Sequence, residues 1–183
     1  SYRGHQKMGN VRNLREYYPE IDSSLRIIKG EGYDTVILAG HSTGGLIASV
    51  YAHDRRSRLM ADALVLNSPF LDMNFSRFKE KVGVPLVSGL GAVMPGVRMS
   101  SGKSTLYGES VHRDHRGEWD YDLELKPVST VPVTFGWTRA IHRGHRKMRK
   151  GLAVSVPVLV MHSDKSVYGD EGSEEFTRGD AVL

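Results

Sequence analysis

The residues best suited to chemistry form a short glycine-flanked run, Gly40-His41-Ser42-Thr43-Gly44. This run matches the pattern G-x-S-x-G, in which a serine lies on a sharp turn from a strand into a helix. A serine exposed in this way can attack a carbonyl carbon and form a covalent acyl intermediate. The pattern therefore predicts that Ser42 is a nucleophile. The backbone N–H of Thr43 is the expected first donor of an oxyanion hole.

The segments on either side supply the context that this motif requires. Residues 35–39 read TVILA, a short apolar run that is typical of a buried strand. Residues 44–56 carry apolar side chains at helical spacing and predict a helix. We expect glycine at Gly40 and Gly44 because a Cβ at either position would crowd the neighbouring strand or helix. The alternative is a glycine-rich turn with an incidental serine.

Length and composition limit the class of protein. The chain has 183 residues, which fits one domain, and its 39% hydrophobic and 25% charged residues are ordinary for a globular protein. It contains no cysteine, which excludes disulfides, thiolate metal sites and a cysteine nucleophile. No apolar run approaches the roughly 18 residues of a membrane span. We therefore expect a cytoplasmic protein.

The positive net charge has a local origin. Residues 139–150 (RAIHRGHRKMRK) hold six Arg or Lys and no acid, and removing them from the net charge of +4 leaves −2 for the rest of the chain. Such a run is usually a solvated helix face. Contact with anionic lipid or nucleic acid is the alternative, although the charge does not extend over the chain as a nucleic-acid footprint would.

Hydrophobic periodicity predicts the remaining elements. Residues 19–29 predict a helix, and residues 134–150 predict an amphipathic helix whose basic residues lie opposite an apolar face. Residues 63–67 and 156–161 are short apolar runs typical of buried strands. Because a helix separates strands 35–39 and 63–67, we expect these strands to be parallel, with ligands bound at their carboxyl ends.

Four segments resemble a known family, the serine α/β-hydrolases of the lysophospholipase and monoacylglycerol-lipase type, sometimes described as serine aminopeptidase-like. The similar segments are GHSTGGLIASVYAH, ADALVLNSPFLDM, LYGESVHRDHRGEWDYDLELKP and VPVLVMHSD. The resemblance implies an α/β class and a partial α/β-hydrolase fold, with a parallel sheet flanked by helices and a mainly helical cap insertion. Residues 1–72 would be the core part with the elbow, residues 73–150 the cap, and residues 151–183 a core strand with the acid loop. Within the cap, the apolar residues 84–99 would suit a lid surface.

The resemblance also implies a catalytic acid and then a histidine base after the serine. We expect the acid after strand 156–161, where GDAVL looks like the family's acid-then-helix segment and favours Asp180. Asp164, beside the strand end, is the alternative acid, and Asp72 after the earlier strand is a third. Each of these would otherwise be a surface carboxylate or a helix cap.

None of the eight histidines occupies the place of the family's base, which follows one further strand. His41 should point away from the serine, as a packing or substrate-pocket residue. His112 and His115 have metal-ligand spacing, but without a clear third ligand we expect no metal. His142 and His145 are expected on the solvated basic face.

The expected site is therefore incomplete. Nothing before residue 19 resembles the loop that supplies the second oxyanion donor. We expect the chain to be an internal piece of a longer hydrolase, truncated before the base, with His162 only a weak substitute. It should have little esterase activity alone, because an unassisted serine is a weak nucleophile. An unpaired apolar edge is expected on strand 35–39.

The resemblance implies a serine hydrolase that cleaves carboxylic esters through an acyl-enzyme at Ser42, with no cofactor. Lysophospholipid, monoacylglycerol or a small acyl ester would be the substrate. A non-catalytic or degenerate hydrolase-fold fragment is one alternative, and an amidase or peptidase of the same fold is another. No nucleic-acid partner is expected, and residues 139–150 would at most contact an anionic membrane surface weakly.

Overall fold

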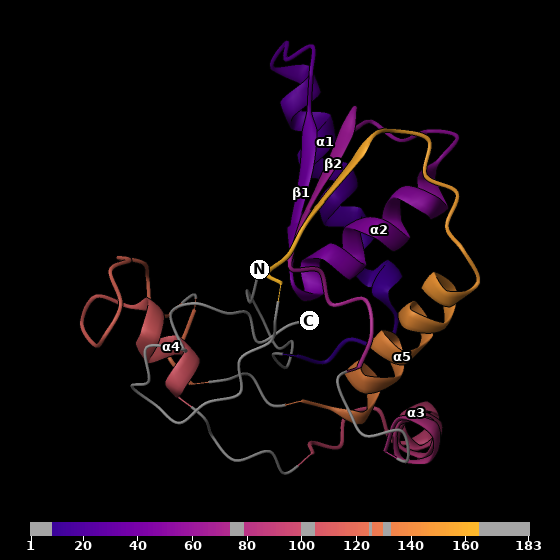
Figure 1. Ribbon diagram of the computed structural model, residues 1–183, viewed down its shortest axis with the longest axis vertical. Coiled ribbons are helices and arrows are strands. Elements are labelled where there is room, and N and C mark those ends of the chain that lie inside the picture. The colour runs from indigo at the N-terminus through magenta and orange to yellow at the C-terminus, as the bar shows by residue number, and fades with distance from the viewer. Residues whose placement is uncertain (1–8, 74–78, 100–104, 125, 130–132, 165–183) are drawn as a thin grey trace.

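The computed structural model describes residues 9–73, 79–99, 105–124, 126–129 and 133–164. Its strands are β1 (Ile37–His41), β2 (Ala63–Asn67) and β3 (Val158–Met161). Its helices are α1 (Tyr18–Gly30), α2 (Thr43–Arg55), α3 (Val84–Val93), α4 (Leu106–Val111) and α5 (Phe135–Arg149), with a 3-10 turn η1 (Leu14–Tyr17) and a π-helical turn η2 (Lys79–Gly83). Figure 1 shows their arrangement.

A parallel sheet with the strand order β1-β2-β3 lies at the centre of the fold. Ile37 of β1 lies opposite Ala63 of β2, and the register continues to His41 opposite Asn67. Helix α2 connects these two strands and packs against both (Figure 1). The predicted parallel βα unit and the α/β class are therefore confirmed.

The first strand differs from its predicted bounds, while the second begins and ends at the predicted residues. β1 covers Ile37–His41 instead of residues 35–39, because Gly40 and His41 pair with Leu66 and Asn67 of β2. The strand therefore runs directly to the residue before Ser42. This shift places the turn immediately at the end of the sheet.

Helix α2 is the centre of the core because it packs on α1, on β2 and on α5. On one side, Ala48 and Ala52 contact Leu64 of β2. On another side, Leu46 contacts the apolar face of α5. The close approach of α5 depends on Gly144, since a Cβ there would lie 2.7 Å from Leu14 Cδ1 and 3.2 Å from Leu46 Cδ2. Helix α2 is thus held on three sides.

The amphipathic helix predicted at residues 134–150 is confirmed as α5. Trp137, Ile141 and Met148 pack into one hydrophobic cluster, as the periodicity predicted. Helix α3 packs in turn on α5 (Figure 1). It contains no charged residue, and its Leu86 and Val93 are 64% and 76% exposed. The apolar surface expected at residues 84–99 is therefore present on a helix, while the division into core and cap stays a prediction.

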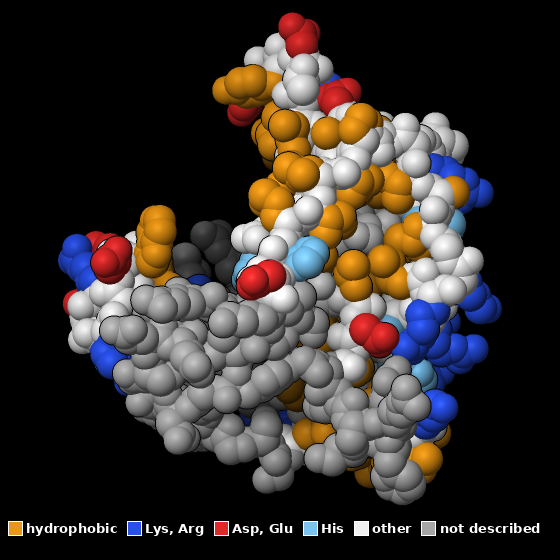
Figure 2. Space-filling model, in the orientation of Figure 1, with side chains coloured by type: hydrophobic (Ala, Val, Ile, Leu, Met, Phe, Trp, Pro, Cys, Tyr) orange, Lys and Arg blue, Asp and Glu red, His pale blue; other side chains and the backbone are white. Residues whose placement is uncertain are grey.

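One face of the sheet lies uncovered among the described residues, and Figure 2 shows hydrophobic side chains gathered over the strands. Ile37, Leu159 and Met161 lie on this face and are 56%, 54% and 42% exposed. Parallel sheets are usually covered on both faces. The expected unpaired edge is also present within the described segments, where β1 pairs with β2 alone. None of the described helices is long and apolar enough to cross a bilayer.

Candidate active site at the turn between β1 and α2

Ser42 is the single residue between the end of β1 and the start of α2. Its φ is 50° and its ψ is −121°. A positive φ is uncommon outside glycine, and a residue held in such a sparsely populated conformation costs about 1–3 kcal/mol. The chain therefore makes the strand-turn-helix junction that the G-x-S-x-G pattern requires, with the serine at its strained position.

Four backbone hydrogen bonds hold Ser42 in this conformation, one of them a long bond of 3.4 Å from the Leu46 N–H to the Ser42 carbonyl. The Ser42 N–H donates to the Asn67 carbonyl at 3.1 Å. Its carbonyl accepts from the N–H groups of Gly45 and Phe70, each at 2.9 Å. Because Asn67 and Phe70 lie at the end of β2 and in the loop after it, the second strand directly supports the turn. These bonds offset the strain at Ser42.

Two glycines make the turn sterically feasible, but they are not the predicted pair. A Cβ on Gly40 would lie 2.6 Å from the Gly44 carbonyl oxygen and 2.9 Å from Gly45 Cα. A Cβ on Gly45 would lie 2.6 Å from Pro69 Cβ. A Cβ on Gly44 would have no atom within 4 Å, so the expectation of crowding at Gly44 is wrong. The phase of α2 decides this, because it turns residue 45 rather than residue 44 towards the loop after β2.

The Ser42 side chain is partly exposed, and no described residue hydrogen-bonds to its hydroxyl. Thr43 is the first residue of α2, and the first N–H groups of a helix have no intrahelical acceptor. The Thr43 N–H and the positive end of the helix dipole therefore lie at the residue that directly follows Ser42. An oxygen that gains negative charge at this position would be stabilised by both.

His41 ends β1 and is exposed at the same edge of the sheet. Its ring Nδ1 lies 3.1 Å from the Asn67 carbonyl oxygen, so Nδ1 donates that hydrogen bond. The Asn67 carbonyl also accepts from the N–H of Ser42. His41 therefore binds the same backbone atom that supports the turn.

The three candidate acids have different surroundings. Asp180 lies outside the described residues. Asp164 lies three residues past β3, is exposed, and bonds to no described residue. Asp72 accepts from Arg149 Nη1 at 3.0 Å and from the Met73 N–H at 2.9 Å. The Asp72 carboxylate is thus paired with a guanidinium rather than with an imidazole.

His145 contradicts its predicted position on a solvated face, since it is fully buried. Its Nε2 donates to the Phe70 carbonyl at 2.9 Å, and its ring lies edge-on to the Phe70 ring with 4.9 Å between centroids. The N–H of Phe70 in turn binds the Ser42 carbonyl. A continuous set of contacts therefore joins α5 to the turn. The spacing contained the signal, because His145 follows Ile141 by four residues on the apolar face of the helix.

His112 is also buried, at 2% exposed, and serves a local purpose. Its Nε2 lies 3.2 Å from the Tyr121 carbonyl oxygen, and its Nδ1 accepts from the Asp114 N–H at 3.2 Å. Both ring nitrogens are therefore engaged with the backbone of the segment that follows α4. In the described ranges, no three His, Asp or Glu side chains gather as metal ligands would.

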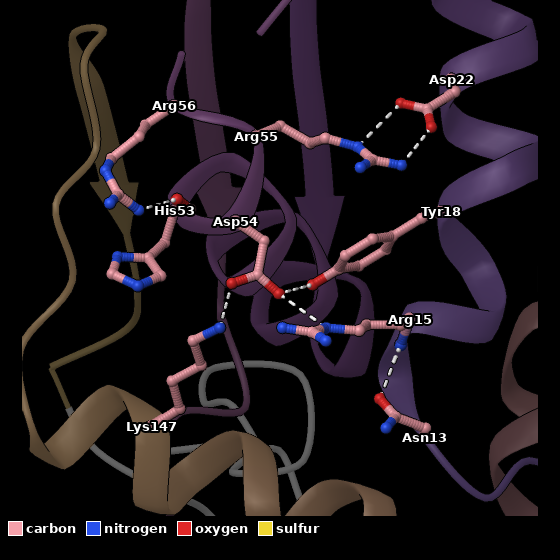
Figure 3. Close-up of polar contacts among 9 residues, drawn as sticks. All are labelled: Asn13, Arg15, Tyr18, Asp22, His53, Asp54, Arg55, Arg56 and Lys147. Atoms are coloured by element: carbon pink, nitrogen blue, oxygen red, sulfur yellow. Dashed lines mark hydrogen bonds and ion pairs between the residues drawn. The ribbon is translucent and has the colours of Figure 1, made fainter. Parts of the chain in front are cut away.

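Polar contacts tie the far end of α2 to its neighbours (Figure 3). The Asp54 carboxylate accepts from Tyr18 Oη at 3.0 Å, from Arg15 Nε at 3.1 Å and from Lys147 Nζ. Burial would raise the pKa of Asp54, but the hydrogen bonds from Lys147, Tyr18 and Arg15 lower it below its ordinary value. As a carboxylate, Asp54 therefore joins α2 to η1, to the start of α1 and to α5.

Three cavities lined by described residues lie beside α1, α2 and α5. The largest has a volume of about 460 Å³ and lies between the last turns of α2 and α5. None of the three is lined by Ser42, so within the described part they are separate from the turn.

Comparisons with known proteins agree with this geometry. The profile of a family described as serine aminopeptidase, S33, matches residues 2–179. Phospholipase YtpA of Bacillus subtilis (strain 168) is 33% identical over 98 residues, which are 52% of this chain and 36% of that protein.

Two solved structures share the fold. A monoacylglycerol lipase of Paleococcus ferrophilus superposes with a TM-score of 0.54 at 21% identity, over 87% of this chain and 56% of the lipase. A soluble variant of monoglyceride lipase from Saccharomyces cerevisiae, in complex with a substrate analog, superposes with a TM-score of 0.59 at 19% identity. The superposition covers 98% of this chain and 62% of the lipase. The chain spans less than two thirds of the length of each of these three proteins.

Proposed function

Because the chain belongs to the serine aminopeptidase S33 family and has an α/β-hydrolase fold of the monoacylglycerol-lipase type, we propose that it carries the nucleophile of a serine ester hydrolase. The observation that supports this most is Ser42, which is held at a positive φ between a strand and a helix, with its side chain partly exposed. Strain of this kind is retained where the surrounding structure over-determines it, and it clusters at active sites.

The proposed reaction begins with attack of Ser42 Oγ on the carbonyl carbon of an ester. The Ser42 proton passes to a histidine, and the carbonyl oxygen, now negative, accepts a hydrogen bond from the Thr43 N–H. One such donor is worth roughly 2.7–4 kcal/mol in the transition state. The alkoxide leaves with a proton from the histidine, and water then hydrolyses the acyl-enzyme by the same steps.

The base and the acid complete this proposal. No histidine in the described segments is hydrogen-bonded to Ser42 Oγ, so we expect the base outside them. Asp180 remains the proposed acid and Asp164 the alternative, since the family order is serine, acid, histidine. Asp72 is less suitable because Arg149 already binds its carboxylate.

The names of the relatives and the surface of α3 support a proposed substrate class. The relatives are named a phospholipase, a monoacylglycerol lipase and a monoglyceride lipase. Helix α3 lacks charge and exposes Leu86 and Val93, which would suit an acyl chain. We therefore propose a lysophospholipid, a monoacylglycerol or a small acyl ester. Amide hydrolysis is the second candidate, because the family is described as an aminopeptidase.

The test is labelling of the protein, at its natural length, with a fluorophosphonate probe. We expect one modified serine, Ser42, and loss of the label in Ser42→Ala. Ser68→Ala is the matched control, since Ser68 also has a positive φ at the end of a strand but is 7% exposed. Labelling of another serine, or none, would overturn the proposal. Comparing p-nitrophenyl butyrate with an aminoacyl p-nitroanilide would separate esterase from amidase.

A further inference from the structure

The largest of the three cavities described above has a strongly basic lining. Its residues are His53, Arg143, Arg146, Lys147, Lys150 and Gly151. None of these described lining residues is acidic, and the cavity volume of about 460 Å³ falls within the roughly 300–1,000 Å³ of small-molecule sites. Figure 2 shows Lys and Arg side chains gathered along the edge of the molecule formed by α5 and the chain after it.

Three of these cations have no partner among the described residues. Arg143, Arg146 and Lys150 are exposed, and their side chains make no hydrogen bond or ion pair there. Lys147 differs, because its Nζ binds the Asp54 carboxylate. Arg143 lies three residues before Arg146, which lies four before Lys150, so they are neighbours on one helix face. Like charges at this spacing repel, and α5 contains no acid to separate them.

The helix dipole explains only part of this arrangement. Cations near the last turn of a helix interact favourably with its negative end, which accounts for Lys150 and Arg146. Arg143 lies two turns before the end, outside the range of that effect. The pKa of His142 is affected by this positive charge, since burial lowers it first and the charges of Arg146 and Arg149 lower it further. A bound anion would offset the repulsion among these cations that the helix dipole does not offset.

His53 adds a directed donor from the opposite wall. Its Nδ1 accepts a hydrogen bond from the Ala153 N–H at 2.8 Å. In the neutral ring, the proton is therefore on Nε2, which can donate to a ligand. His53 is on α2, and residues ninety positions later on α5 form the other wall. Two guanidinium groups, the Lys150 ammonium group and an imidazole N–H thus line one cavity beside the Asp54-bound Lys147. Guanidinium and ammonium donors of this kind match the oxygens of a phosphate.

We propose that this cavity binds a phosphate group, carried either by a soluble phosphate ester or by the headgroup of an anionic lipid. His53 lies ten residues along α2 from Thr43, which is about 15 Å at the rise of an α-helix. The phosphate site is therefore at the opposite end of α2 from Ser42, and it does not depend on the reaction proposed there. The proposal assigns the weak anionic contact expected of residues 139–150 to one cavity. A single cavity without interleaved aromatic side chains fits one phosphate better than a strand of nucleic acid.

Calorimetry measures the binding of inorganic pyrophosphate to the chain. Co-sedimentation measures the binding of the chain to phosphatidylglycerol vesicles, with phosphatidylcholine vesicles as the uncharged control. The variants are Arg143→Gln and Lys150→Gln, singly and together. Arg26→Gln is the matched control, because Arg26 is an exposed cation on helix α1 without a partner in the described part. Each substitution in the cavity should weaken binding at least about tenfold, as loss of a hydrogen bond to a charged group does. The control should leave it unchanged, and binding should weaken as salt is added.

The arms of the experiment also identify the source of the phosphate. Binding of pyrophosphate that the cavity variants lose supports a soluble ester. Binding of anionic vesicles alone, with the same loss, supports a lipid headgroup. Absence of both, or equal binding by the double variant and Arg26→Gln, would overturn the proposal, as would binding only of an oligonucleotide. Folding is controlled through thermal unfolding without anion at low salt, where the double variant should unfold at the same or a higher temperature because repulsion has been removed.

Discussion

A Cβ at Gly40 should destabilise the turn at Ser42, whereas a Cβ at Gly44 should not. The Cβ of Gly40→Ala would lie 2.6, 2.8 and 2.9 Å from three backbone atoms in the first turn of α2. These atoms cannot rotate away as side chains can, so either α2 or β1 must shift. Overpacking of this kind costs about 1–3 kcal/mol, and the rigid neighbours favour the upper end.

The matched variant is Gly44→Ala, whose Cβ would have no atom within 4 Å. Gly44 lies inside α2 without a positive φ, so alanine should stabilise the helix by about 0.4–1 kcal/mol. The free energies of unfolding of the two variants should therefore differ by about 3–4 kcal/mol. This is a large fraction of the 5–15 kcal/mol of a typical domain.

Urea unfolding followed by far-UV circular dichroism measures this difference directly. Gly45→Ala should behave like Gly40→Ala, since its Cβ would meet Pro69 at 2.6 Å. If Gly40→Ala were as stable as the parent, or if Gly44→Ala were the less stable of the two, the steric account of the turn would be refuted. The same variants can be followed by the rate of fluorophosphonate labelling, which should fall only where the turn is displaced.

Three further predictions follow from the described contacts. Ser42→Gly should have a free energy of unfolding roughly 1 kcal/mol higher than Ser42→Ala, because glycine tolerates φ 50° better than alanine does. Equal stabilities would mean that the turn is unstrained. The pKa of Asp54 is lowered, so its carboxylate stabilises the fold above the unfolded pKa of about 3.9, and this contribution is lost as the pH falls through the folded pKa. Asp54→Asn should therefore flatten the dependence of the free energy of unfolding on pH between about pH 5 and 2. A dependence parallel to that of the parent would contradict this role of Asp54. His145→Leu should lower the free energy of unfolding by about 1–3 kcal/mol, because it leaves the Phe70 carbonyl without its donor. It should also slow fluorophosphonate labelling of Ser42. An unchanged labelling rate would show that α5 does not position the turn.

The sequence identified the elements whose signals are local. β2 was predicted at its observed residues because Ser68-Pro69 ends the apolar run. α5 was predicted to within one residue because its apolar stripe has helical spacing. β1 was displaced by two residues because glycine and histidine have little strand propensity, and Gly40 and His41 are in the strand only through pairing with β2. Tertiary pairing is not contained in local propensity.

The candidate site was also predicted only in part, because some of its features depend on contacts between distant segments. The motif located Ser42 and its turn, since strand, glycine and helix are adjacent in sequence. The crowded glycine was misassigned because the difference between Gly44 and Gly45 depends on where α2 meets Pro69. The role of His145 could have been predicted from its place on the apolar face of α5, although its acceptor Phe70 lies 75 residues away.

Helix α2 links both proposed sites through a single physical property. Its positive end lies at Ser42, where negative charge would develop on a substrate oxygen, and its negative end lies near His53 and the basic cavity. The dipole therefore helps an oxyanion at one end, but at the other end it favours cations and opposes an anion. A phosphate in the cavity must gain more from Arg143, Arg146 and Lys150 than it loses to the ends of α2 and α5. Since the dipole effect is about 0.3–1 kcal/mol and a hydrogen bond to a charged group contributes about 1.5–3 kcal/mol, even two such bonds are sufficient. Removing the charges of both Arg143 and Lys150 leaves Arg146 as the one described lining cation without a partner, since Lys147 is bound to Asp54. Binding by the double variant that equalled binding by Arg26→Gln would therefore contradict this balance.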